Sequence, residues 1–426
     1  MIPLSLREIA RLCPGKLELE PEAEEVTGVQ IDSRRIVPGD LFVAVRGGRE
    51  FVADALGRGA AAALIPDDPF AALAALGNAV RSRASARPVG ITGSVGKTST
   101  KDILAALCAP HARTIAAEAS YNAELGVPLT LCRLEANTEV CILELAMRGF
   151  GQIAQLCAIA EPELGVITSV APVHLEFVGS LEGVARAKAE LLQALPDGAT
   201  AIVPVDAPAL EPFLDDRLDV VRFGPGGEVT LEAFEPPRLV ASVGGGRVEL
   251  EVDFTAAHQA QNALPALAAY AALGLPLERA AEGTGEIHFS RLRGEEIELS
   301  GGGTLINDCW NANPVSMRAA LAHLAARAEG RTVAVLGDMA ELGVDAAAYH
   351  RDVGKAAAQA DLLIAIGPLA QGYVEGAGHG VWAETVEEGI HELEARLEPG
   401  DTVLVKGSRA MGLEAVGEAL TAVKTP

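Results

Sequence analysis

The sharpest chemical signal in the chain is a short glycine-rich segment, residues 93–100, which reads GSVGKTST. Glycines in such a turn let backbone N–H groups close on phosphate oxygens, and a following helix offers its positive end. We expect Lys97 to reach the β- and γ-phosphates of a nucleotide, and the hydroxyl of Thr98 to bind Mg²⁺. The predicted nucleotide contacts come from successive residues: Gly93, Ser94, Val95, Gly96, Lys97, Thr98 and Ser99.

This segment is a shorter variant of the general phosphate-binding pattern, because Ile91 stands where that pattern has a glycine, five residues before Gly96. An ordinary glycine turn without a ligand is the alternative interpretation. The apolar run 88–92 predicts a strand before the turn, and the pattern over 99–107 predicts a helix after it. Strand, glycine turn and helix in this order favour the phosphate-binding interpretation.

The elements that would position this loop follow an α/β alternation. Short apolar runs at 140–144, 165–170 and 200–203, with helical stretches between them, predict a doubly wound parallel sheet. Residues 219–254 alternate apolar residues with Gly and Pro, which predicts antiparallel hairpins before a helix over 259–272. A second α/β alternation follows, with β-type runs at 304–307, 332–336, 361–366 and 402–405.

A chain of 426 residues is long enough for two to four domains, and we expect three, all α/β. Residues 1–83 predict a small N-terminal domain with strands near 26–31 and 40–45 and an Ala-rich helix around 53–63. Residues 84–292 predict a central P-loop domain with a parallel sheet. Residues 293–426 predict a Rossmann-like C-terminal domain.

Composition narrows the functional classes. Hydrophobic residues make up 49% of the chain and aromatic residues 4%, so an aliphatic core is expected. The formal net charge of -24 argues against a general nucleic-acid binder, which needs clustered Lys and Arg. The six cysteines are irregularly spaced, without a C-x-x-C pair, so neither a zinc knuckle nor a disulfide framework is indicated.

We expect a cytoplasmic protein without membrane insertion. The first residues carry charges at Arg7, Glu8 and Arg11, where a signal peptide needs an apolar core. The longest uncharged stretch, 255–277, is interrupted by polar residues and two prolines, so it is interpreted as a buried helix after a polar cap.

Several segments resemble, in order, the signatures of the Mur ligase family. ITGSVGKTSTKD at 91–102 is similar to the ATP-binding loop of that family. The other similar segments are ASYNAELGVP at 119–128, LELAM at 143–147, ITSVAPVHLE at 167–176, ARAKAEL at 185–191, NDCWNANPVSM at 307–317, LGDMAELG at 336–343 and VKGSR at 405–409.

The resemblance implies an ADP-forming ligase that makes an amide bond through an acyl phosphate, with ATP and Mg²⁺. It implies metal ligands at Thr98, Glu144, His174 and Lys188, the last as a carbamate formed with CO₂. Lys97, Lys188 and His174 become the catalytic candidates. Without the resemblance, Glu144 is a solvated strand-end carboxylate, His174 a loop histidine and Lys188 a lysine on a solvated helix face.

The resemblance also implies binding roles. Asn262, Arg291 and Asp308 would contact the nucleotide, although His258 and Asn262 together could also form a polar cap at a helix N-terminus. The remaining candidates would bind substrate: Asp32, Ser33, Arg34 and Asn122, together with Asn311, Asn313, Lys406 and Arg409 in the third domain, which would receive a dipeptide.

The third-domain strings resemble the family members that join D-alanyl-D-alanine to a UDP-linked muramoyl tripeptide in peptidoglycan synthesis. We therefore expect these small-molecule substrates, no nucleic acid and a monomer. The alternatives are another Mur-type amino acid ligase, a folylpolyglutamate synthetase-like ligase, or a P-loop switch that ligates nothing. The choice between lysine and diaminopimelate at the third peptide position stays open.

Overall fold

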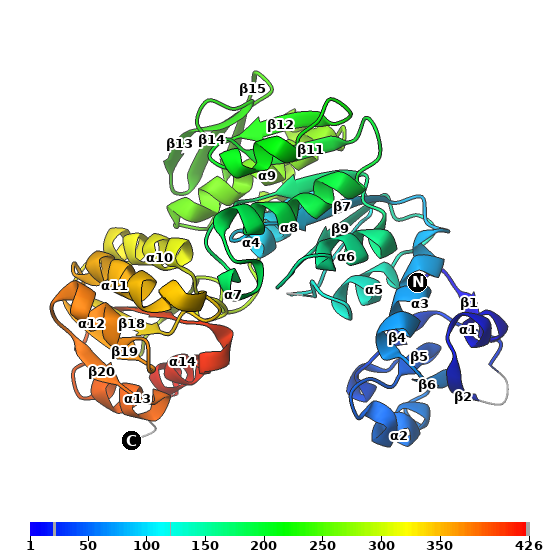
Figure 1. Cartoon of the computed structure of the whole chain (residues 1–426), viewed down its shortest axis with the longest axis horizontal. Coiled ribbons are helices and arrows are strands. Elements are labelled where there is room, and N and C mark those ends of the chain that lie inside the picture. The colour runs from blue at the N-terminus through cyan, green and yellow to red at the C-terminus, as the bar shows by residue number, and fades with distance from the viewer. Residues whose placement is uncertain (20–22, 120, 423–426) are drawn as a thin grey trace.

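The computed structural model describes residues 1–19, 23–119 and 121–422. Three α/β domains follow one another along the chain, as expected, each built on its own sheet. The central domain lies at the top of Figure 1, with the N-terminal domain in blue and the third domain in yellow to red on either side beneath it. The exact domain boundaries stay a prediction. Ser120, in the second of the family-like segments, lies outside the described residues.

The first domain contains a four-stranded sheet in the order β2–β6–β5–β4, in which β4, β5 and β6 are parallel and β2 is antiparallel to β6. Its strands are β2 (Gly15–Leu19), β4 (Gly28–Gln30), β5 (Asp40–Val43) and β6 (Ala62–Pro66), and β1 (Leu4–Ser5) pairs separately with β3 (Glu25–Val26). Its helices are α1 (Leu6–Leu12), α2 (Val52–Gly57) and α3 (Pro69–Arg81), with single turns η1 (Ser33–Arg35) and η2 (Gly48–Phe51).

One sequence prediction in this domain is wrong. The Ala-rich helix expected around 53–63 ends at Gly57, and Ala62 and Ala63 belong to strand β6. Both alanines are fully buried, because β6 is a central strand between β2 and β5. Sheet pairing here overrides the helix propensity of alanine. Helix α3, for which no prediction was made, packs against the central domain through α5 and α6.

The central domain has a nine-stranded sheet in the order β15–β14–β13–β12–β11–β10–β7–β9–β8. Six neighbouring strands of this sheet, from β12 across to β8 in the spatial order, are parallel. They are β7 (Arg87–Thr92), β8 (Thr114–Ala116), β9 (Val140–Glu144), β10 (Leu164–Ile167), β11 (Thr200–Pro204) and β12 (Asp219–Phe223). The antiparallel part is β13 (Val229–Glu235), β14 (Arg238–Val243) and β15 (Gly246–Glu251). The hairpins predicted from residue 219 therefore begin only after β12, which extends the parallel sheet.

Helices cover both faces of this sheet, as the predicted doubly wound arrangement requires. On one face, Val140 and Ile142 of β9 share a core with helices α4 (Lys97–Cys108) and α9 (Ala257–Ala272). On the other face, Cys141 and Leu143 share a core with helices α6 (Gln152–Ala160) and α8 (Leu181–Ala194). The shorter helical elements are α5 (Gly126–Leu131), α7 (Leu175–Val178), η3 (Pro208–Phe213) and η4 (Leu277–Glu286).

The third domain has a six-stranded sheet in the order β16–β17–β21–β18–β19–β20, parallel except for β16. The strands are β16 (Glu295–Glu298), β17 (Thr304–Asn307), β18 (Thr332–Gly337), β19 (Leu362–Ile366), β20 (Val381–Ala383) and β21 (Thr402–Lys406). Helices α10 (Pro314–Arg327), α11 (Ala346–Ala357) and α12 (Gln371–Ala377) share a core on one face, and α13 (Val386–Glu394) and α14 (Glu414–Thr421) on the other. Single turns η5 (Gly343–Asp345) and η6 (Arg409–Met411) complete it.

The close approach of η4 to α4 gives a test of central-domain packing. A Cβ at Gly283 would lie 2.2 Å from the carbonyl oxygen of Ala106 and 2.7 Å from Cα of Leu107, both backbone atoms. Gly283→Ala should therefore lower the free energy of unfolding by about 1–3 kcal/mol, the usual cost of overpacking. Urea unfolding followed by circular dichroism measures it. Gly285→Ala is the matched control, since nothing lies within 4 Å of that position, and equal midpoints for the two variants would contradict the packing described.

Candidate functional site

The glycine-rich loop joins β7 to α4 at the carboxyl end of the central sheet. Its two glycines are required for different contacts. Gly93 has φ +151°, and a Cβ there would lie 1.9 Å from Oγ1 of Thr168. Gly96 has φ +85°, and a Cβ there would lie 2.3 Å from Oδ1 of Asn262. Only glycine fits both the backbone conformation and the space.

The end of the neighbouring strand β10 holds this loop in place. Ser94 donates from its backbone N–H to Ser169 O at 3.0 Å and from its hydroxyl to Ala171 O at 3.0 Å. The backbone N–H of Val95 donates to the Ser169 hydroxyl at 2.9 Å, and the Thr168 hydroxyl donates to Val95 O at 2.6 Å. The family-like segments at 93–100 and 167–176 are therefore held against each other by these hydrogen bonds.

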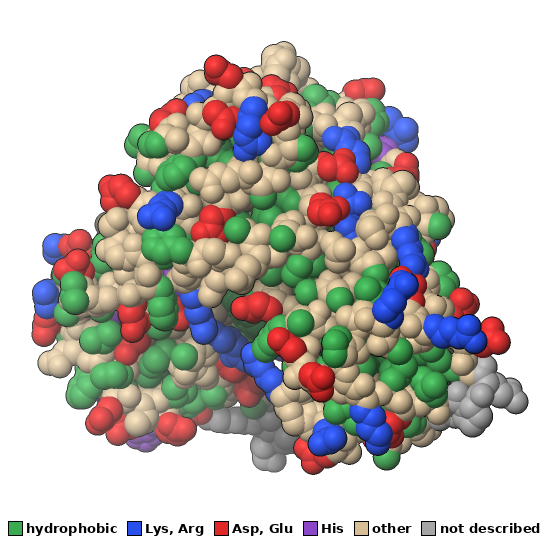
Figure 2. All heavy atoms as spheres, turned by 45° about the vertical axis from the view of Figure 1, so that its right-hand side comes forward, with side chains coloured by type: hydrophobic (Ala, Val, Ile, Leu, Met, Phe, Trp, Pro, Cys, Tyr) green, Lys and Arg blue, Asp and Glu red, His purple; other side chains and the backbone are tan. Residues whose placement is uncertain are grey.

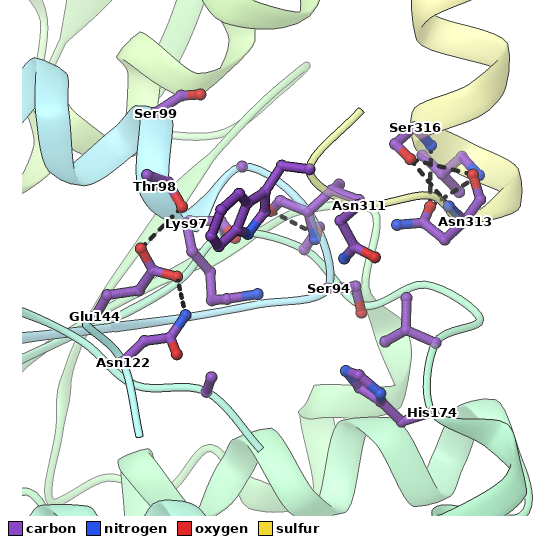
Figure 3. A pocket seen from close by; sticks show the side chains of 18 of the residues that line it. Ser94, Lys97, Thr98, Ser99, Asn122, Glu144, His174, Asn311, Asn313 and Ser316 are labelled. Carbon is purple, nitrogen blue, oxygen red and sulfur yellow. Dashed lines mark hydrogen bonds between the residues drawn. The ribbon is translucent and has the colours of Figure 1, made fainter. Parts of the chain in front are cut away.

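Glu144, fully buried at the end of β9, accepts hydrogen bonds from two side chains that line the site. Thr98 donates its hydroxyl to one carboxylate oxygen at 2.9 Å, and Asn122 donates its amide to the other at 2.7 Å. Lys97 folds back and donates to the carbonyl oxygen of Gly93 at 2.8 Å. Figure 3 shows the Lys97 side chain between Glu144 and His174. Burial lowers the pKa of Lys97, while the nearby Glu144 carboxylate opposes that shift.

These residues line a cavity of about 1090 Å³ that all three domains share. The first domain contributes Arg46, the central domain the glycine-rich loop with Glu144 and His174, and the third domain the loops after β17, β18 and β21. Figure 2 shows Lys and Arg side chains along the hollow between the two lower lobes. Parallel strands place their carboxyl ends at one edge, and in both large sheets that edge faces the cavity.

His174 lies beside the cavity in an unusual backbone conformation, with φ 54° in the left-handed region. Its Nδ1 is 2.5 Å from Oε2 of Glu341, which belongs to the third domain. Burial lowers the pKa of His174, although the Glu341 carboxylate acts in the opposite direction.

Lys188 lies on α8 with 2% of its surface exposed, and no salt bridge reaches it from the described residues. Burial lowers the pKa of its ammonium group well below the usual value, and the positive charge of Lys97 adds to this shift. Both effects favour the neutral amine over the ammonium form. The helix-face alternative expected a solvated lysine, and the burial contradicts it.

On the nucleotide side, Asn262 lines the cavity next to Gly96, and its carbonyl oxygen accepts a hydrogen bond from Thr100 at 3.2 Å. His258, one turn earlier on α9, also lines the cavity, and burial lowers its pKa to about 4. Asn262 forms no cap for α9, whose N-cap is Ala256 without a side-chain hydrogen bond.

Arg291 does not line the cavity and is exposed to solvent. Arg293, two residues later, lines it instead, with a buried Nε that has no hydrogen-bond partner in the described part of the chain. Burial lowers the pKa of Arg293, against the attraction of the Glu144 and Asp308 carboxylates. Nucleotide contact by Arg291, which the family resemblance implies, stays a prediction, and Arg293 is the arginine of this pair that lines the cavity. A buried guanidinium nitrogen without a hydrogen-bond acceptor, at the wall of a cavity, indicates a place for an anionic ligand.

The third-domain candidates lie together at the carboxyl ends of β17 and β21. Buried Lys406 donates to Oδ2 of Asp308 at 2.6 Å and to the carbonyl oxygen of Asn311 at 2.9 Å. Asn313 is the N-cap of α10, and its Oδ1 accepts from the backbone N–H groups of Val315 and Ser316. Lys406 and Asn313 therefore shape the loop, whereas the Asn311 side chain is exposed at the cavity.

Trp310 was not predicted as a site residue, yet its ring lies close to two arginines of this site. The guanidinium of Arg409 lies 5.3 Å from its ring centroid and that of Arg293 lies 5.7 Å away, which are cation–π distances. Arg409 also pairs with Glu414. The segment that contains Trp310 was recognised in the sequence, but the partners of its ring could be found only in space.

The first-domain candidates do not reach the cavity. Asp32 caps η1 and accepts from the Arg34 guanidinium at 2.7 Å, and Ser33 is buried beneath them. Among the described residues of the first domain, Arg46 is the one that lines the cavity, and it was not predicted from the sequence. It has φ 41°, a conformation that non-glycine residues rarely adopt.

Within the described ranges, no group of three or more His, Cys, Asp or Glu side chains is placed to hold a metal ion. The Thr98 hydroxyl and the Glu144 carboxylate nevertheless form a pair of hard oxygen donors 2.9 Å apart. Such a pair suits Mg²⁺, which keeps several waters and takes phosphate oxygens as further ligands. Among the same residues, no helix is long and apolar enough to cross a membrane.

Two family models match the chain, the Mur ligase middle domain over residues 91–270 and the Mur ligase, glutamate ligase domain over residues 292–409. The UDP-N-acetylmuramoyl-tripeptide–D-alanyl-D-alanine ligase of Mycobacterium tuberculosis H37Rv is 35% identical over 504 aligned residues, covering 100% of this chain and 99% of that protein.

Solved structures agree with these matches. A crystal structure of MurF from Acinetobacter baumannii has a TM-score of 0.86 and 28% identity, covering 98% of this chain and 99% of that one. MurF ligase from Thermotoga maritima in complex with ADP has a TM-score of 0.79 and 26% identity, covering 92% and 97%.

Proposed function

The chain belongs to the Mur ligase family, and we propose that it joins D-alanyl-D-alanine to UDP-N-acetylmuramoyl-tripeptide, using ATP, in peptidoglycan precursor synthesis. One observation carries the proposal. A single cavity brings the phosphate-binding loop of the central domain together with Asn311 and Arg409 of the third domain. Activation of an acid and capture by an amine can therefore take place in one cavity. The cytoplasm, where ATP is available, is the proposed location.

The chemistry requires an activated acyl group, because a carboxylate does not react with an amine at neutral pH. The terminal carboxylate of the tripeptide attacks the γ-phosphorus of ATP, which forms an acyl phosphate and releases ADP. The amino group of D-alanyl-D-alanine then attacks the acyl carbon, loses a proton and expels inorganic phosphate. Both steps move negative charge between phosphate oxygens, so positioned cations are the main contribution of the protein.

Two cations of this chain are placed for that role. Lys97 follows the glycine-rich loop, and its flexible side chain can leave the carbonyl oxygen of Gly93 for a phosphate. Arg293 lines the same cavity with a buried Nε that has no hydrogen-bond partner among the described residues. Mg²⁺ would be held by Thr98 and Glu144, and when bound it supplies further positive charge to the phosphate oxygens. Asn122 then serves to orient the Glu144 carboxylate.

Lys188 is proposed to carry a carbamate. A neutral amine reacts with CO₂ to form an N–C bond and releases one proton, which leaves a carboxylate-like anion in place of a cation. The lowered pKa of Lys188 favours the neutral amine that this reaction needs. The resulting anion would offset the charge of Lys97, and it would provide oxygen ligands for Mg²⁺ near His174.

The domains divide the substrates between them in this proposal. Residues 293–426 bind the dipeptide, with Asn311 and Arg409 in contact and Lys406 and Asn313 fixing the loop. Residues 84–292 bind ATP, with Asn262 on the nucleotide side, and Asp308 of the third domain contributes to the same side of the cavity. Residues 1–83 bind the uridine nucleotide through the turn at 32–34, and Arg46 extends that domain to the cavity. A monomer is sufficient for this arrangement.

The direct test measures ADP release and amide formation with ATP, Mg²⁺, the UDP-linked tripeptide and D-alanyl-D-alanine. Lys97→Ala should lower turnover by about 100-fold or more, since a charge at the phosphates is lost. Lys355→Ala, which removes an exposed lysine, should have no effect. A preference for a single amino acid would favour another Mur-type ligase, and turnover of a folate acceptor would favour a folylpolyglutamate synthetase-like activity. ATP hydrolysis without any acceptor would favour a switch protein.

The two neighbouring arginines give a matched pair. Arg293→Ala should lower kcat/KM for ATP by about 10- to 100-fold, the range for losing a hydrogen bond to a charged group. Arg291→Ala should stay close to the wild-type value because its side chain is exposed to solvent and does not line the cavity. Steady-state kinetics over a range of ATP concentrations measures both, and a larger loss in Arg291→Ala would reverse the assignment.

The carbamate can be observed directly. Protein equilibrated with ¹³C-bicarbonate should give a carbamate signal in its ¹³C NMR spectrum, and Lys188→Ala should lack it. Carbamate formation releases a proton, so the signal should weaken as the pH falls and the amine becomes protonated. Lys188→Glu, which keeps an anion, should retain more activity than Lys188→Ala. A wild-type spectrum without the signal at saturating bicarbonate would refute the modification.

A further inference from the structure

One carboxylate joins the central and third domains beside the cavity. Glu341, in the loop after β18, places Oε2 2.5 Å from Nδ1 of His174 and Oε1 3.3 Å from Nε of Arg148. The backbone N–H of Glu176 also donates to the carbonyl oxygen of Glu341 at 3.4 Å. Three central-domain groups thus meet one residue of the third domain.

The backbone on both sides of this contact is unusual. Six non-glycine residues in the described chain have positive φ, and two of them are His174, at 54°, and Glu341, at 62°. Residues in this region persist only where their surroundings fix them, and they gather at functional sites. Two such residues meeting across a domain boundary indicate that the contact is built into the fold rather than a chance pairing of surface charges.

The loop that carries Glu341 is firmly attached to its own domain. The backbone N–H of Met339 donates to Nε2 of buried His350 at 3.0 Å, and that of Ala340 donates to the Ser408 hydroxyl at 2.9 Å. His350 in turn lies 2.7 Å, through Nδ1, from the carbonyl oxygen of Ala346. Because the loop is braced on both sides, Glu341 moves with the third domain.

The hydrogen bond decides which ring nitrogen of His174 carries the proton. A carboxylate can only accept, so Nδ1 must donate, and in a neutral imidazole Nε2 is then left with its lone pair. Metal-binding histidines commonly donate their other ring N–H to a carboxylate, which fixes the tautomer and the ring orientation. Here that carboxylate comes from a different domain.

We propose that Glu341 is a positioning residue that holds His174 in its Nδ1-protonated tautomer, so that the metal-binding form of His174 is present only while the third domain lies against the central domain. Completion of the metal site would then depend on domain closure. The metal-binding role of His174 rests on the proposed function, whereas the tautomer and the domain contact do not. Arg148 supports the same carboxylate from the central domain.

The tautomer can be read by NMR of unliganded protein with ¹⁵N-labelled histidine, with the His174 signal assigned by its loss in His174→Gln. Wild type should show a proton on Nδ1. Glu341→Ala should shift the signal toward the Nε2-protonated form, and Glu341→Gln, which keeps an acceptor but loses the charge, should lie between them. Glu176→Ala is the matched control, because it removes an exposed carboxylate beside the same contact.

Domain position is measured independently with spin labels. All six native cysteines are buried, so labels should attach at Asp197→Cys and Glu387→Cys, two exposed positions in the central and third domains. Glu341→Ala should broaden the distance distribution of unliganded protein, and Glu176→Ala should not. With a non-hydrolysable ATP analogue, Glu341→Ala should also weaken Mn²⁺ binding by about 10- to 100-fold, as loss of an outer partner of a metal ligand does.

Two results would overturn the proposal. One is a wild-type tautomer and distance distribution in Glu341→Ala, and the other is unchanged Mn²⁺ affinity when the tautomer and distances have shifted. If instead the wild-type protein forms no amide bond with any substrate, the proposed function fails, and the NMR and distance measurements still decide whether Glu341 controls His174.

Discussion

The geometry of the site depends on how closely the loop after β7 lies against the end of β10. Ser94 and Val95 are tied to residues 168–171 by hydrogen bonds from both backbone and side chains. This approach is possible only because Gly93 and Gly96 have no Cβ. The loop fixes where α4 begins, and therefore where Thr98 meets Glu144 and where Lys97 enters the cavity.

Many strands and helices could be predicted because the hydrophobic pattern of each segment agrees with its place in the tertiary structure. Strand β9 and strand β17 coincide with their predicted bounds, since both are short apolar runs buried on two faces. The alanine run near residue 60 failed for the opposite reason. Alanine favours a helix locally, but Ala62 and Ala63 fill a central strand whose neighbours come from distant parts of the chain. The secondary structure of such a segment is set by its pairing with distant strands and not by its local sequence.

The site could be predicted as a set of motifs but not as a set of contacts. Residues within a motif, such as Lys97 and Thr98, could be predicted to lie at one site because they are adjacent in the chain, and both line the cavity. Arg293 was not predicted to line the cavity, because two arginines stand two residues apart and the sequence alone does not show which one lies there. Glu341 lay within a recognised segment, yet its partner His174 is 167 residues away in sequence. Burial of Lys188 likewise appears only once α8 is packed.

The distribution of charge has a consequence for which molecules can approach. The chain as a whole carries 58 acidic against 34 basic residues, whereas the cavity lining contains six Lys or Arg and five Asp or Glu. The outer surface therefore repels extended polyanions, while the recessed wall does not oppose a compact phosphate-bearing molecule. Long-range repulsion is screened over about 8 Å at physiological ionic strength, so it acts on nucleic acids and acidic proteins at the surface more than on a small ligand already inside. The negative surface thus disfavours extended polyanions such as RNA before any specific contact is made. A compact phosphate-bearing molecule can still reach the glycine-rich loop.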